Sequence, residues 1–131
     1  MAKTAATVFL GLHGLVHLLY LGQALKVFQL QPGLTWPAGS WLFSKPIGDS
    51  ATRTLASVLC VVAALAFVVG AAGLALNQSW WRFVTVAAAA FSGVLYLVLW
   101  NGKLQRLDQQ GLVGLLLDAV IIAVVAIVRW P

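Results

Sequence analysis

Three ionisable side chains lie inside long apolar stretches of the sequence, namely His13, His17 and Asp118. In a helix that crosses a membrane, such groups are costly and usually face the interior of a bundle. Counted from the middle of each stretch, His17 and Asp118 lie within about 3 Å of the same depth. They can therefore meet as an acid–base pair, or as a hydrogen bond that fixes two helices against each other.

Further polar residues recur at helical spacing around these three. Tyr20 follows His13 and His17 in the pattern i, i+4, i+7, and Ser92 and Tyr96 lie four residues apart in a third apolar stretch. Each helix then has a polar stripe that can face a common interior. A pocket for a lipophilic molecule would use hydroxyl groups of this kind to orient its ligand. The predicted ligand-binding set is His13, His17, Tyr20, Ser92, Tyr96 and Asp118.

This set leaves three interpretations open. His17 and Asp118 either fix helix register or act as the acid–base pair of a small membrane enzyme, in which case they are its catalytic candidates. No nucleophile motif accompanies them, so the sequence leaves enzymatic activity uncertain and favours a non-enzymatic role. A metal site would use His13, His17 and Asp118. We expect none, because the HExxH glutamate and a cysteine cluster are both missing.

The sequence does not identify a cofactor, so the cofactor is unknown at this point. Haem b would need an axial ligand from a second helix, whereas both histidines belong to one helix and the only methionine is Met1. The single cysteine, Cys60, lies inside an apolar stretch and reads as a small buried hydrophobic residue.

The elements that must position these residues follow from composition. Of 131 residues, 62% are hydrophobic and 8% charged, far from the roughly 45–50% and 25% of soluble proteins. Four apolar runs approach the 20 or so residues needed to cross a bilayer, where backbone groups must be satisfied within a helix. We predict one all-α domain over 1–131, an integral membrane four-helix bundle running up-down-up-down with both termini on one side. Its helices are expected at about 5–26, 53–76, 80–100 and 111–129.

The segment 27–52 is the only long connection between the predicted helices. It contains the turn sequences around Pro32, Pro37 and Pro46, yet it is rich in apolar residues. We expect it to lie on the membrane surface as a cap over one end of the bundle, since long loops of this kind are often functional. We name this end side B, and the end with both termini side A.

Charge and tryptophan positions agree with four spans. All six tryptophans fall near a predicted membrane surface, as in an aromatic belt. The net charge of +5 comes from single Lys and Arg residues at helix ends, which suits lipid headgroups better than nucleic acid. Five lie on side B and three on side A, so side B is predicted to be cytoplasmic: Lys26, Lys45, Arg53, Lys103 and Arg106, against Lys3, Arg82 and Arg129.

The stretch His13-Gly14-Leu15-Val16-His17-Leu18, with Trp80-Trp81 and the helix end Trp100-Asn101-Gly102-Lys103, resembles a known pattern. Over nearly its whole length the chain resembles an uncharacterised group of small bacterial four-span membrane proteins with an HG-x-x-HL motif in the first helix, sometimes automatically named transporter permeases. The resemblance implies a bacterial cytoplasmic membrane and carries over no catalytic residue. The excess of Lys and Arg on side B then places the termini in the periplasm. In that group an Asp-x-Lys follows the tryptophan and an amide often replaces Asp118, so Asn101 and Asp118 depart from it.

The predicted function is that of a small non-enzymatic membrane protein, which binds a partner subunit or a lipophilic ligand through a polar intramembrane pocket. The alternatives are a membrane enzyme with His17 and Asp118, and a metal-binding or transport component. Transport would need further subunits or homo-oligomerisation, because no phosphate-binding loop or inverted repeat is visible. The expected partners are membrane lipid and a homo-oligomer or larger membrane complex, with no nucleic acid.

Overall fold

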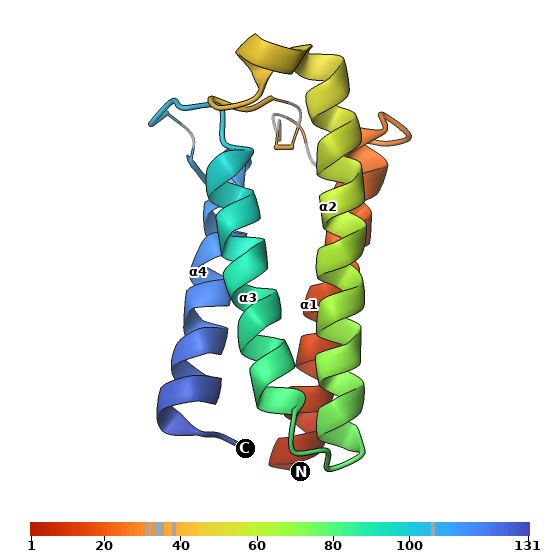
Figure 1. Ribbon diagram of the computed structural model, residues 1–131, viewed down its shortest axis with the longest axis vertical. Coiled ribbons are helices and arrows are strands. Elements are labelled where there is room, and N and C mark those ends of the chain that lie inside the picture. Colours follow the sequence, from red (N-terminus) through yellow and green to blue (C-terminus); the bar gives the residue numbers. More distant parts are fainter. Residues whose placement is uncertain (31, 33–35, 38, 106) are drawn as a thin grey trace.

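A computed structural model describes residues 1–30, 32, 36–37, 39–105 and 107–131. These residues form α1 (Ala2–Ala24), α2 (Ser44–Ala75), α3 (Trp81–Val98), a 3₁₀ turn η1 (Leu107–Gln110), and α4 (Leu112–Ile122), which continues as the π-helical η2 (Ala123–Val128). The helices run up and down, and both termini lie at the bottom of the view in Figure 1, which is side A. The predicted all-α four-helix bundle with both termini on one side is confirmed.

Three of the helices have the length and composition of membrane spans. α1, α2 and α3 are each long and apolar enough to cross a bilayer, and the helical stretch Leu112–Val128 is apolar but shorter. Large apolar side chains such as Leu12, Leu65 and Val94 are exposed on the outside, whereas histidine, aspartate, serine and threonine side chains are buried inside. This distribution, with apolar side chains outside and polar ones inside, is the reverse of that in soluble proteins. The chain is therefore a small helical membrane protein.

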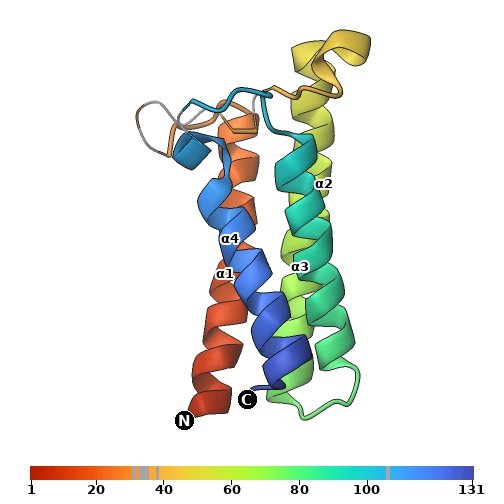
Figure 2. The ribbon, with the colours of Figure 1, turned by 90° about the vertical axis from the view of Figure 1, so that its left-hand side faces the viewer.

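The predicted helix bounds need one substantial correction, at the start of α2. This helix begins at Ser44 rather than at 53, so the segment 27–52 is partly helical. Gly48, with φ of 81°, interrupts the helix, and the turn before it tips away from the axis of α2 in Figure 2. Glycine takes a positive φ without strain, which permits this change of direction. The prediction followed the apolar run and therefore missed a polar first turn outside it.

Small residues set the distances between neighbouring helices. A Cβ atom added to Gly14 of α1 would lie 2.7 Å from Phe67 Cβ of α2, and one added to Gly114 of α4 would lie 2.2 Å from the Tyr96 ring of α3. Such approaches bring backbones together where the hydrophobic effect cannot. α1 packs along α2, α2 along α3 and α3 along α4, whereas α1 and α4 touch little. Figure 2 shows that α4 is inclined within the bundle.

The described part of the loop before α2 closes the side-B end. Trp36 is 0% exposed and packs against Tyr20 and Tyr96, with ring centroids 4.7 and 4.5 Å away. The last turn of a helix leaves carbonyl groups without intrahelical donors. At the end of α3, Trp41 Nε1 donates to the Leu97 carbonyl at 2.8 Å, and the Ser40 hydroxyl donates to that of Val98. The loop thereby satisfies the end of α3.

Candidate functional site

A buried hydrogen bond joins α1 to α4 in the middle of the bundle. His13 Nε2 lies 2.9 Å from Asp118 Oδ1, and the two residues are 5% and 1% exposed. The second carboxyl oxygen, Asp118 Oδ2, is buried and has no hydrogen-bond partner among the described residues. Since α1 and α4 otherwise touch little, this pair is the main polar link between them.

The second histidine joins α1 to α3. His17 Nε2 lies 2.8 Å from Ser92 Oγ, and His17 Nδ1 lies 3.1 Å from the carbonyl oxygen of His13. A carbonyl only accepts, so Nδ1 must carry a proton, and in the neutral ring Nε2 then accepts from the Ser92 hydroxyl. The backbone of α1 thus fixes the tautomer of His17.

These contacts correct the predicted pairing. Asp118 bonds His13 rather than His17, and His17 bonds Ser92 instead. The depth count assumed parallel helices with known ends, but α4 is inclined (Figure 2) and α1 begins at Ala2. One helical turn is only about 5.4 Å, so these differences are enough to exchange one histidine for the other.

Aromatic side chains surround the polar residues. The ring of Phe67, from α2, lies 4.8 Å from that of His13 and 5.6 Å from that of His17. Nearer side B, Tyr20 and Tyr96 gather around Trp36, and the Tyr96 ring also lies 6.0 Å from that of His17. Phe67 and Trp36 were not among the predicted residues, and only their aromatic character within an apolar context could have marked them.

The side chains present limit the chemistry that the polar cluster can perform. Among the described residues, no group of three His, Cys, Asp or Glu side chains could hold a metal ion, because His17 is turned toward Ser92. A hydroxyl beside an imidazole is also the arrangement of a nucleophile and its base. However, His17 and Ser92 are both 0% exposed, so no substrate can reach them in this structure.

Two cavities lie close to the cluster without including its centre. The first has a volume of about 280 Å³ and lies between α1 and α4 on side A, with walls made almost entirely of carbon. It is lined by Ala5, Ala6, Phe9, Leu10, Trp81, Val120, Ile121, Val124, Val125, Trp130 and Pro131. The second, of about 180 Å³, lies between α3 and α4 toward side B. Of the six predicted residues, only Tyr96 lines either of these two cavities.

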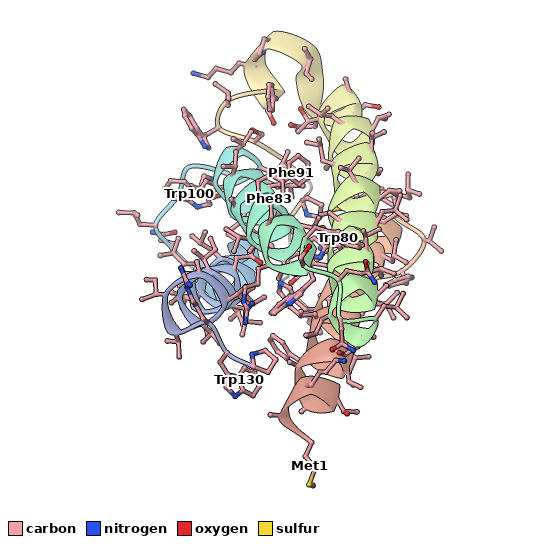
Figure 3. The ribbon with its side chains drawn as sticks, turned by 60° about the horizontal axis from the view of Figure 1, so that its bottom comes forward. Met1, Trp80, Phe83, Phe91, Trp100 and Trp130 are labelled. Atoms are coloured by element: carbon pink, nitrogen blue, oxygen red, sulfur yellow. The ribbon has the colours of Figure 1, made fainter. Side chains whose placement is uncertain are left out.

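Figure 3 brings the side-A end of the bundle forward and shows Trp130 beside the end of α4, next to α1. Trp130 belongs to the wall of the first cavity. We name this first space the α1–α4 cavity.

Comparison with known protein families, with characterised proteins and with solved structures finds no match for the chain. The resemblance to the group with the HG-x-x-HL motif therefore stays a prediction, and the site must be interpreted from its own geometry.

The His17–Ser92 bond predicts a modest effect on stability. Ser92→Ala removes an interhelical hydrogen bond, and we expect it to lower the free energy of unfolding in detergent by about 1 kcal/mol. Ser57→Ala is the matched control, because the Ser57 hydroxyl bonds the Arg53 carbonyl of its own helix. Equal unfolding curves for the two variants would show that the His17–Ser92 bond contributes nothing between helices.

Proposed function

We propose that the chain is a non-enzymatic, multi-pass protein of a bacterial cytoplasmic membrane that binds a lipophilic ligand in the α1–α4 cavity. The observation that carries this proposal is the cavity itself, an apolar space of about 280 Å³ between two helices that touch little. The predicted resemblance to small bacterial four-span proteins supports the choice of membrane.

The volume and walls of the cavity favour an acyl chain. Its volume is near the lower end of the roughly 300–1,000 Å³ of small-molecule pockets. Because its walls offer almost no polar atoms, a polar ligand would lose its hydrogen bonds to water without replacement. A partner helix, about 10 Å across with its side chains, needs an open face rather than a space of this size.

The polar cluster then has a supporting role in this proposal. His13 and Asp118 tie α1 to α4, and the cavity lies between the same two helices on side A. The pair therefore keeps the helices at a fixed separation near the inner end of the cavity. This role differs from the predicted one, in which the polar residues themselves contact the ligand.

Photolabelling tests the proposal. The full chain in detergent micelles is incubated with a monoacylglycerol that carries a diazirine on its acyl chain, and labelled residues are mapped by peptide mass spectrometry. We expect labelling to concentrate on the cavity walls. Two variants fill the space from opposite helices, Ala5→Phe and Val124→Trp, and each should reduce this labelling about tenfold, equivalent to about 1.4 kcal/mol.

Leu116→Trp is the matched control, since Leu116 lies on the exposed face of α4 outside the cavity. Labelling should be unchanged in this variant. Labels spread evenly over the exposed faces of all four helices, and unaffected by either filling variant, would overturn the proposal.

A further inference from the structure

A polar cavity adjoins the α1–α4 cavity at the side-A surface. Its volume is also about 280 Å³, and it shares Trp81 and Pro131 with the apolar space. Its remaining walls combine polar and apolar groups and include two cations, Lys3 and Arg82. Together the two spaces form an apolar compartment between the helices and a cationic one at the surface.

The cations in this polar cavity have no acidic side chain to neutralise them. The chain contains three acidic residues. Asp118 bonds His13 in the middle of the bundle, whereas Asp49 lies near the start of α2 and Asp108 lies in η1, both at the side-B end. The ammonium group of Lys3 donates to the neutral Asn77 amide oxygen at 2.6 Å. The positive charge at this end is therefore open to an external anion.

Arg82 has donor capacity left over. Its Nη2 donates to the carbonyl oxygen of Arg129 at 3.0 Å and to a main-chain oxygen of Pro131, the last residue of the sequence, at 3.4 Å. Its Nε is buried and has no hydrogen-bond partner among the described residues. The guanidinium group also lies over the Trp81 ring, 4.9 Å from its centroid. A guanidinium held in place by main-chain oxygens, with one N–H free, suits the oxygens of a phosphate group.

We propose that the ligand is an anionic phospholipid, with one acyl chain in the α1–α4 cavity and its phosphate group at Lys3 and Arg82. This inference rests on the proposed function and adds the class of headgroup. Trp81 lies in the walls of both spaces, and tryptophan is typical of the headgroup level of a membrane. The change from apolar to cationic walls therefore matches the change from acyl chain to headgroup.

Native mass spectrometry of the full chain tests the inference. The protein in detergent is titrated with phosphatidylglycerol and, separately, with phosphatidylcholine of the same acyl chains. Each cation near an anionic headgroup contributes about fivefold in affinity. With two cations, we expect one phosphatidylglycerol to bind about 25-fold more tightly than phosphatidylcholine. Inorganic phosphate should not displace it, because free phosphate lacks the acyl chain.

Three variants locate the headgroup. Lys3→Gln and Arg82→Gln should each reduce the preference for phosphatidylglycerol about fivefold. Arg82→Lys keeps the charge without the planar fork, so it should retain part of the preference and excludes misfolding as the cause. Lys103→Gln, an exposed cation on side B, should leave the preference unchanged.

The outcomes separate this inference from the proposed function. Equal binding of both lipids that Ala5→Phe abolishes would overturn the headgroup inference and leave the proposed function standing. A preference that Lys103→Gln reduces as much as Lys3→Gln would also overturn the inference, since general attraction would then account for it. If neither lipid binds, or if Ala5→Phe has no effect on either, both proposals fail.

Discussion

Replacing His13 by alanine is expected to lower the free energy of unfolding in detergent by about 3 kcal/mol. Breaking a buried pair typically costs about 3–5 kcal/mol, since the remaining group loses its partner. We expect the lower end because a single hydrogen bond, at 2.9 Å, joins the two side chains. In His13→Ala neither oxygen of the Asp118 carboxyl would keep a hydrogen bond within the described bundle.

Leu12→Ala is the matched control for this prediction, because Leu12 lies on the exposed face of the same helix. A double-mutant cycle with His13→Ala and Asp118→Ala should give a coupling energy of about 1–2 kcal/mol, the upper part of the range for interhelical hydrogen bonds in membranes. If His13→Ala unfolds as Leu12→Ala does and the cycle shows no coupling, the pair does not hold α1 to α4.

Gly14→Ala should lower the free energy of unfolding by about 2–3 kcal/mol through overpacking. The added methyl group would lie 2.7 Å from Phe67 Cβ and 3.1 Å from the Ala64 carbonyl oxygen. Neither atom can swing aside, since one is a backbone atom and the other is attached directly to the backbone. α1 would have to move away from α2, which would also strain the hydrogen bonds of His13 and His17.

The neighbouring glycine of the same helix provides the control. A Cβ atom on Gly11 would meet nothing within 4 Å, so Gly11→Ala should be neutral or stabilise the helix by up to about 1 kcal/mol. Chemical unfolding in mixed detergent micelles measures both variants. A Gly14→Ala protein as stable as Gly11→Ala would mean that α1 and α2 do not pack as closely as described.

The fold could be predicted because the membrane allows few alternatives. Long apolar runs with satisfied backbone groups must be helices, and the number of crossings fixes the relative positions of the termini. The exact start of α2 was beyond reach, since Ser44–Ile47 is a polar turn outside the apolar run. Gly48 ends this turn with a positive φ, and nothing in the composition shows whether a glycine will adopt one.

The polar cluster could be predicted in membership but not in pairing. Polar residues inside spans collect together, so His13, His17, Ser92 and Asp118 do meet. Which histidine bonds Asp118 depends on helix inclination and on a difference of one turn, which residue counting cannot resolve.

The α1–α4 cavity was not predictable for a different reason. Alanine and valine residues that line a cavity read the same as those that face lipid, because both surroundings are apolar. Ala6 and Val125, for example, look in the sequence like any other small apolar residue of their helices. Only the placement of α1 relative to α4 shows that a space lies between them.

The two histidines of α1 bond different helices although they are only four residues apart. Each residue turns a helix by about 100°, so a separation of four brings the two rings within about 40° of each other around the axis. Inserting one residue between them would turn one ring about 100° away from its partner. The four-residue spacing therefore fixes how α1 is rotated about its own axis. Lipid-facing residues of α1 can vary freely, but the number of residues between His13 and His17 cannot.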